Sequence, residues 1–256
     1  MSALEVLQIA VYDDNYIYLI HDSDSGETAC VDPAVAGPVK QALSEKGWTL
    51  GQILNTHHHP DHTGGNLELK EAYGCTITGA KSDAARIPGI DVRVSEGDTV
   101  SLGDHLARVF DVPGHTSGHN AYWFEADDAL FCGDTLFSLG CGRVFEGTAD
   151  QMWDSLQKLR NLPDDTLVYC AHEYTAANAA FALSVDPDNP ALIERANEIT
   201  ELRRADKPTV PSRLGSEKAA NPFMRADIDS LKAAAGLIGQ DAVQTFAEIR
   251  RRKDNF

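Results

Sequence analysis

Four histidines and one aspartate lie within six residues of the segment THHHPDHTGG, Thr56 to Gly65. The segment follows the apolar run QILN, which predicts a buried strand that ends in this loop. Imidazole and carboxylate groups are the ligands that borderline divalent ions such as zinc prefer. Alternate residues of an extended loop point to opposite sides, so the middle histidine of the run should point away from its neighbours. The candidate metal ligands of this loop are His57, His59, Asp61 and His62.

Three more apolar runs end on a candidate ligand. The run VFDVPGHTSGH contains His115, ALFCGDTLF contains Asp134 and LVYCAHEYT contains His172. Seven donors exceed the four of a structural zinc site and suit two metal ions. We expect one metal at His57, His59 and His115, the other at Asp61, His62 and His172, and Asp134 between them.

The segments that must position these residues change character near residue 173. Before it, short apolar or alternating runs such as NYIYLIHD and ALFCGD predict strands, and TADQMWDSLQKLRNL predicts a helix capped by Thr148. After it, the Ala-rich segments TAANAAFALSV, ALIERANEITELRRA and DAVQTFAEIRRRK predict helices, whereas KPTVPSRLGSEKAANPF predicts an irregular connection. We therefore expect an α/β or α+β domain of stacked layers over residues 1–173 and a small helical domain over residues 174–256.

Charge and composition exclude several classes of protein. The chain has 256 residues, 43% of them hydrophobic, which is enough for a large core and argues against disorder. No run of about 18 apolar residues occurs, so we expect no membrane span. The net charge is −17, and residues 174–256 carry equal numbers of acidic and basic side chains, so the excess lies in residues 1–173. Such a charge repels nucleic acid and anionic lipid, and we expect neither as a partner.

Five scattered cysteines without CxxC spacing favour a reducing compartment, and we expect a cytoplasmic protein. Cys141, between two glycines, is the one cysteine in a predicted site loop. A thiol nucleophile needs a histidine base, and the nearby histidines are already assigned to metal. We therefore expect no cysteine catalysis.

The motifs together resemble those of the glyoxalase II family, the hydroxyacylglutathione hydrolases of the metallo-β-lactamase superfamily. The resemblance spans nearly the whole chain. The motifs THHHPDHTGG, VPGHTSGH and FCGDTLFSLGCGRVFEGT indicate the superfamily. The motifs AHEYTAANAAFA, NPFMR and RRRKDNF indicate the glyoxalase II family within it.

This resemblance implies a four-layer αββα sandwich followed by a small α-helical C-terminal domain that binds substrate. It also implies two divalent metal ions, zinc first, with iron and manganese as alternatives, and hydrolysis of the thioester of S-D-lactoylglutathione. Two cations lower the pKa of a bridging water toward 7, and the hydroxide attacks the thioester carbonyl. In this scheme Asp134 bridges the metals, and Asp61 binds one metal and helps to orient the hydroxide. A monomer is expected, with a glutathione thioester as the small-molecule partner.

The resemblance also assigns the substrate contacts. Arg250 and Lys253 match residues that bind the carboxylates of glutathione, Tyr174 matches a phenol that contacts the peptide, and Arg143 matches a basic contact. Some family members have Lys in place of Arg143 and Tyr in place of Phe145, so one hydroxyl is missing here. From composition alone, the run Arg250 to Lys253 is equally well explained as the favourable basic end of a helix.

Two other functions fit part of the pattern. A persulfide dioxygenase of the same superfamily uses a single iron and does not need Asp61, His62 and His172 as a second ligand set. A metal-binding protein without catalysis needs no substrate contacts. The complete set of seven donors disfavours both.

Overall fold

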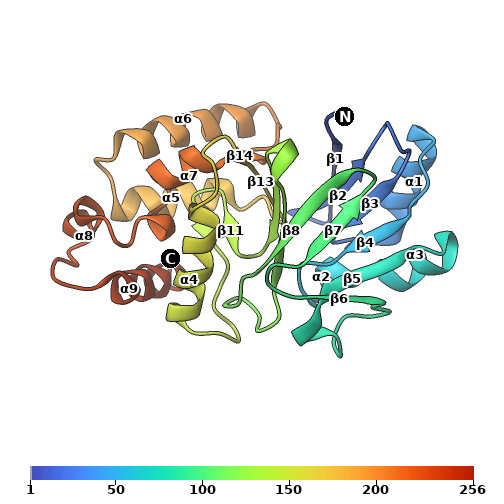
Figure 1. The fold of residues 1–256 in the computed structure, drawn as a ribbon. Coiled ribbons are helices and arrows are strands. Elements are labelled where there is room, and N and C mark those ends of the chain that lie inside the picture. The colour runs from blue at the N-terminus through green and yellow to red at the C-terminus, as the bar shows by residue number, and fades with distance from the viewer. Residues whose placement is uncertain (1) are drawn as a thin grey trace. The chain divides into compact units, whose positions relative to one another are not determined.

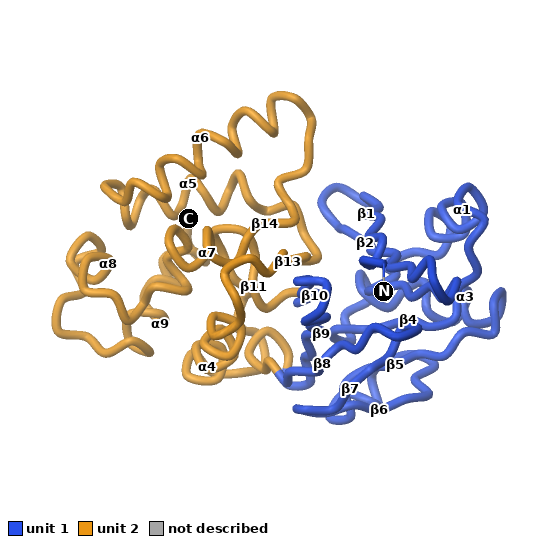
Figure 2. The backbone as a smooth tube through the Cα atoms, turned by 45° about the horizontal axis from the view of Figure 1, so that its top comes forward, with its two compact units in different colours: residues 1–111, 117–133 blue, residues 112–116, 134–256 orange. Residues whose placement is uncertain are grey.

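The computed structural model describes residues 2–256, which form two compact units (Figure 2). Unit 1 comprises residues 1–111 and 117–133, and unit 2 comprises residues 112–116 and 134–256. The chain passes from one unit to the other near the predicted ligands His115 and Asp134, so each unit holds part of the predicted ligand set. Among the described residues, no helix is long and apolar enough to cross a membrane.

The first sheet of unit 1 has six strands in the order in which they occur in the chain. Neighbouring strands are antiparallel from β1 to β3 and parallel from β3 to β6. The parallel connections carry helices α1, α2 and α3, and the chain after β5 forms the short 3₁₀ helix η1. These elements are β1 (Glu5–Val11), β2 (Asn15–His21), β3 (Thr28–Val31), α1 (Ala36–Lys46), β4 (Gln52–Leu54), α2 (Pro60–Thr63), α3 (Asn66–Tyr73), β5 (Thr76–Ala80), η1 (Lys81–Asp83) and β6 (Val92–Val94).

The second sheet of unit 1 is an antiparallel run in the order β10, β9, β8, β7. Its strands are β7 (Thr99–Leu102), β8 (His105–Asp111), β9 (Asn120–Phe124) and β10 (Ala129–Gly133), with the 3₁₀ helix η2 (Glu125–Asp127) before β10. The Tyr18 ring of the first sheet packs edge-on against Phe131 of the second, with ring centroids 5.5 Å apart. The backbone N–H of Asn120 also donates to the carbonyl of Thr56 at 2.8 Å. The two sheets therefore form a sandwich within unit 1.

Both faces of the first sheet are covered. Alternate residues of β2, such as Ile17 and Leu19, join an apolar cluster with Val39 and Leu43 of α1 and Leu69 of α3. Figure 1 shows both helices on one side of this sheet. Because its remaining residues face the second sheet, β2 is buried along its whole length and its sequence, NYIYLIH, is almost continuously apolar.

Unit 2 is mainly helical. Its elements are β11 (Leu136–Phe137), β12 (Gly140–Cys141), α4 (Ala149–Arg160), β13 (Leu167–Cys170), α5 (Thr175–Val185), α6 (Pro190–Arg204), β14 (Ser212–Arg213), α7 (Leu214–Ala220), the 3₁₀ helix η3 (Pro222–Met224), α8 (Asp229–Ala234) and α9 (Ala242–Asp254). Strands β11 and β12 form a hairpin, and β13 pairs with β14. Thr148 caps α4 through a capping box with Gln151, as its sequence predicts.

The three helices predicted after Tyr174 are α5, α6 and α9. The prediction of an irregular connection over residues 207–223 is wrong, because this segment contains β14, α7 and η3. Short helices such as α7 are stabilised by tertiary packing rather than by intrinsic propensity. Leu214 and Ala220 of α7 are fully buried, and Ala220 packs in a cluster with Leu192 of α6.

Candidate metal centre and substrate contacts

The donor loop after β4 carries the four ligands predicted in unit 1. β4 ends at Leu54, and the loop continues in buried backbone through Thr56 and His57. Pro60 begins α2, where a proline costs no backbone hydrogen bond, and this helix places Asp61 and His62 in one turn. The side chain of Asn55 donates to the carbonyl of His62 at 3.1 Å, and this bond stabilises the conformation of the loop.

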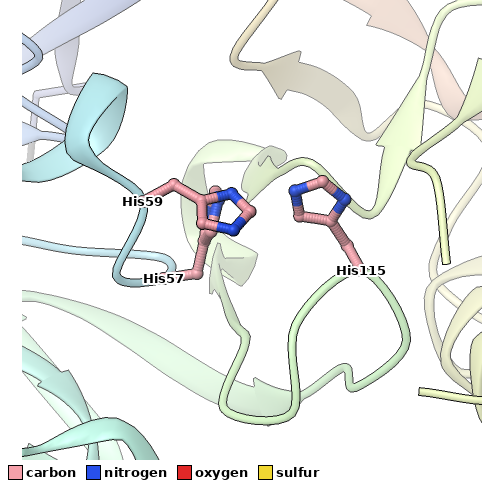
Figure 3. A group of neighbouring side chains, drawn as sticks. All are labelled: His57, His59 and His115. Atoms are coloured by element: carbon pink, nitrogen blue, oxygen red, sulfur yellow. The ribbon is translucent and has the colours of Figure 1, made fainter. Parts of the chain in front are cut away.

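The donor atoms of this loop face each other in two pairs. His57 Nε2 lies 3.0 Å from His59 Nδ1, and Figure 3 shows these two rings beside each other. His62 Nε2 lies 3.5 Å from Asp61 Oδ2. His57 and His62 are fully buried, so their ring nitrogens are already withdrawn from bulk water. Closely spaced nitrogen and carboxylate donors of this kind suit a divalent cation.

Asp32 fixes the proton positions of two of these histidines. Its Oδ2 accepts from His62 Nδ1 at 3.0 Å and from the Thr56 hydroxyl at 2.6 Å. Because that hydroxyl donates to Asp32, its oxygen accepts from His57 Nδ1 at 3.1 Å. With Nδ1 protonated, the Nε2 atoms of His57 and His62 keep the lone pairs that a metal needs.

Sequence reasoning missed Asp32. The aspartate follows the buried run TACV directly, as the predicted ligands follow theirs, but it stands alone in the sequence. Its role depends on contacts with residues 24 and 30 positions away.

The middle histidine of the run has a different partner, as its predicted direction implies. His58 Nδ1 donates to Asp83 Oδ2 at 2.7 Å, and Arg86 Nε donates to the other oxygen of the same carboxylate. Asp83 is almost completely buried. The pair therefore fixes the loop between His57 and His59.

Unit 2 contains the other three predicted ligands, and Asp134 lies between the two histidines. Its Oδ2 is 3.3 Å from His115 Nε2, and its Oδ1 is 3.3 Å from His172 Nε2. All three residues are at most 6% exposed. Each carboxylate oxygen thus faces a different imidazole nitrogen, which is the arrangement expected of a carboxylate that bridges two cations.

Two glycines allow this packing. Gly133, just before Asp134, has a φ of +49°, and a Cβ there would lie 2.3 Å from Thr56 Oγ1. A Cβ on Gly142 would lie 1.9 Å from the Asp134 carbonyl oxygen. A larger residue at Gly133 would have to adopt a strained backbone conformation and displace the Thr56 side chain, and one at Gly142 would have to move the backbone of Asp134.

The histidines of unit 2 are oriented by their surroundings. His115 Nδ1 donates to the carbonyl of Arg143 at 2.9 Å, so its Nε2 carries the lone pair. The ring of His172 stacks on that of Tyr174, with centroids 4.7 Å apart and planes inclined by 1°. Phe145, which is 61% exposed, has its ring centroid 5.1 Å from that of His115.

The predicted substrate contacts of unit 2 include a group of cations. The side chain of Arg143 is 65% exposed and its Nε lies 4.0 Å from Asp254 Oδ1. Lys253 is half-buried and donates to the carbonyl of Ala177. Loss of solvation, and then the charges of Arg250 and Arg143, lower the pKa of Lys253. An anion bound among these groups relieves their mutual repulsion.

Arg250 is more deeply buried than Arg143 and Lys253. It is 7% exposed, and its guanidinium donates to the carbonyl of Cys141 at 2.8 Å and to Asp254 at 2.9 Å. The bond to Cys141 holds the C-terminal helix α9 to the β11–β12 hairpin, whereas the bond to Asp254 lies within α9. Its predicted contact with substrate remains a prediction.

The cysteines are poorly suited to nucleophilic catalysis. All five are buried. Burial raises the pKa of Cys141 to about 11 despite the nearby Arg250. Because the thiolate is the nucleophile, a thiol with this pKa is inert at neutral pH.

Comparison with known proteins gives one consistent set of relatives. A family model described as "Metallo-beta-lactamase superfamily" matches residues 12–172, and one described as "Hydroxyacylglutathione hydrolase C-terminus" matches residues 173–256. A hydroxyacylglutathione hydrolase of Methylococcus capsulatus is 61% identical over 99% of both chains. One from Rhodospirillum rubrum is 57% identical over 100% of both chains. Among solved structures, ETHE1 from Myxococcus xanthus has 27% sequence identity and a TM-score of 0.70, covering 96% of this chain and 90% of its own.

Proposed function

Because the chain belongs to the hydroxyacylglutathione hydrolases of the metallo-β-lactamase superfamily, we propose that its seven predicted donors hold one pair of metal ions at which a glutathione thioester is hydrolysed. The chain is a metal-dependent hydrolase of S-lactoylglutathione, with a metallo-β-lactamase domain followed by a C-terminal helical domain. The finer statements that follow concern its ligands, its metals and its substrate contacts.

We assign His57, His59 and His115 to one metal and Asp61, His62 and His172 to the other, with Asp134 shared by both. The observation that carries this proposal is the placement of Asp134, whose two oxygens face two different histidines at 3.3 Å. A single family model, which matches residues 12–172, also covers all seven donors.

We propose zinc as the metal, with iron and manganese as alternatives. Nitrogen and carboxylate oxygen ligands suit zinc, iron and manganese, and none of the seven donors is a thiolate. When bound, the divalent ions supply Lewis acidity, which lowers the pKa of a coordinated water toward 7 and stabilises negative charge on the thioester carbonyl oxygen.

The residues of the chain then have distinct tasks. Asp134 keeps His115 and His172 on either side of its carboxylate. Asp61, which is partly exposed, orients the attacking water. Asp32 and the Arg143 carbonyl keep the histidine lone pairs directed at the metals. The products are glutathione and a 2-hydroxy acid. Because a thiolate is a good leaving group, no general acid is required.

The substrate contacts are proposed for unit 2. Arg143 and Lys253 provide positive charge for the carboxylates of glutathione, and Tyr174 presents its ring beside the ligand His172. Tyr174, Arg250 and Lys253 belong to residues 174–256, which we propose as the substrate-binding domain. Local cations are needed here because the chain as a whole has a charge of −17 and the substrate is an anion.

We also propose that the protein acts as a monomer in the cytoplasm, with neither nucleic acid nor membrane as a partner. The strongly negative charge supports the exclusion of polyanions. Five buried cysteines without a disulfide in the described part of the chain support a reducing compartment. Size-exclusion chromatography with light scattering tests the oligomeric state.

The deciding experiment combines metal analysis of the purified protein with an ultraviolet assay for loss of the thioester. We expect about two metal ions per chain and rapid turnover of S-D-lactoylglutathione. Asp134→Ala should lose metal and nearly all activity. Asp186→Asn, a change at another buried aspartate of unit 2, should keep both.

Other results would refute parts of the proposal. Two metals and normal turnover in Asp134→Ala would remove the bridging role. One iron per chain with oxygen uptake on glutathione persulfide would favour the dioxygenase instead. Metal without turnover of any glutathione thioester would leave only a metal-binding protein.

A further inference from the structure

The hairpin of β11 and β12 joins three parts of the proposed site. Asp134 lies two residues before its first strand, and Arg143 lies two residues after its second. Near its open end, the N–H of Gly142 donates to the carbonyl of Thr135 at 3.2 Å. Arg143 supplies the carbonyl that fixes His115. A shift of this hairpin would therefore displace a bridging ligand, a histidine partner and a substrate contact together.

The tip of the hairpin has an unfavourable backbone conformation. Leu139, at the turn, has a φ of +56°, a conformation that side chains other than glycine rarely adopt. The residue is fully buried and packs against Ala182 of α5 and Leu192 of α6. The surrounding helices must hold this turn, because local preference alone does not favour it.

Three buried polar side chains from the helical segment bind the hairpin tip. Asn178 of α5 donates to the carbonyl of Ser138 at 3.1 Å, and Glu217 of α7 accepts from the N–H of Leu139 at 2.8 Å. Asn221 donates to the carbonyls of Phe137 and Gly140 at 3.1 and 2.9 Å. We call Asn178, Glu217 and Asn221 the hairpin clamp.

The clamp is itself a connected network. Asn221 Nδ2 donates to Glu217 Oε2 at 3.1 Å, while its Oδ1 accepts from the N–H of Phe223. Glu217 and Asn221 are both 0% exposed. Burial raises the pKa of Glu217, and the hydrogen bond from the Leu139 N–H opposes this rise. A buried polar group that loses its hydrogen bond raises the free energy of the folded protein. The bonds of this network therefore favour one position of the hairpin tip.

We propose that Asn221 and Glu217 are positioning residues that hold the β11–β12 hairpin, so that Asp134, the Arg143 carbonyl and hence His115 keep the geometry required for metal binding. The proposal rests on the metal centre proposed above. It assigns a role in positioning the metal ligands to the C-terminal helices, in addition to substrate binding. It also gives a function to the NPFMR segment, which supplies Asn221.

Asn221→Ala tests the clamp, and Asn189→Ala is its matched control. Asn189 is a buried asparagine of the same unit that caps α6 and binds Asp186 and the Ala219 carbonyl, and within residues 2–256 its side chain makes no hydrogen bond to the hairpin. Both variants should lower the melting temperature. Only Asn221→Ala should also release metal to a chelator faster, by about tenfold or more, as loss of a group that orients ligands does.

Two further readouts separate positioning from general destabilisation. In the cobalt-substituted protein, the visible absorption bands report ligand geometry, and they should change in Asn221→Ala but not in Asn189→Ala. The kcat of Asn221→Ala should fall more than its KM rises. If Asn221→Ala fails to fold, Asn178→Ala removes one bond of the clamp instead. It should change the metal release rate, the cobalt spectrum and kcat in the same direction but by less.

Wild-type protein that binds no metal would refute the proposed metal centre itself. If wild type binds two metals but both Asn221→Ala and Asn178→Ala keep its metal release rate, cobalt spectrum and kcat, the clamp is purely structural and the inference is wrong. Equal changes in the Asn189→Ala control would also overturn it.

Discussion

Removal of the Asp32 carboxylate should weaken metal binding without removing any proposed ligand. Asp32 is 3% exposed and accepts from the N–H of Thr56, the hydroxyl of Thr56 and Nδ1 of His62, at 2.8, 2.6 and 3.0 Å. In Asp32→Ala, His62 loses its direct partner. The hydroxyl that orients His57 is also no longer held.

The size of the effect follows from these bonds. A hydrogen bond to a charged group contributes about 1.5 to 3 kcal/mol. Since about 1.4 kcal/mol corresponds to a factor of ten, loss of the His62 bond alone predicts metal binding weaker by roughly 10-fold to 100-fold. The indirect effect through Thr56 adds to this, so the upper part of the range is expected.

Chelator competition on the loaded enzyme measures the change, with Asp22→Ala as the matched control. Asp22 is also buried in unit 1 and faces a histidine, because its Oδ1 lies 3.7 Å from His105 Nε2. That histidine is not a predicted ligand. A metal dissociation constant for Asp32→Ala within about twofold of both wild type and Asp22→Ala would refute the assigned role, given the 10-fold to 100-fold effect expected of groups that orient ligands.

Three further changes concern substrate binding and the thiol. Lys253→Ala should raise KM about fivefold, as a partly exposed ion pair of about 1 kcal/mol predicts, with kcat unchanged. Because the pKa of Lys253 is lowered, its contribution is present at neutral pH and is lost as pH rises through that pKa, so KM should rise at alkaline pH in wild type but not in the variant; a pH-independent wild-type KM would contradict this. Phe145→Tyr supplies a hydroxyl and should lower KM by about twofold to tenfold, and an unchanged KM would show that the hydroxyl finds no partner. Cys141→Ser should keep kcat because the pKa of this thiol is about 11, and complete loss of turnover would restore a thiol mechanism.

The sequence predicted those features that depend on neighbouring residues. The apolar runs before His57 and Asp134 mark buried strands, and these two proposed ligands follow the strand ends. Thr148 caps α4 because a capping box needs only a residue three positions away. Local patterns of this kind are readable without knowledge of the tertiary structure.

The features that escaped prediction depend on distant residues. Asp32 reaches His62 across 30 positions, and Asn221 reaches Gly140 across 81. Each is a single polar residue in the sequence, without a cluster or a period that marks it. The helix α7 escaped for a similar reason, because it is short and is stabilised by burial against α6.

The five buried cysteines give the chain internal reporters of unfolding. A thiol-specific reagent reaches a buried thiol only after the structure around it opens. Cys30 and Cys75 lie in unit 1, whereas Cys141 and Cys170 lie in unit 2. Site-resolved labelling rates therefore reveal whether the two units open together or one before the other. Labelling with and without metal shows which opening event the metal centre suppresses.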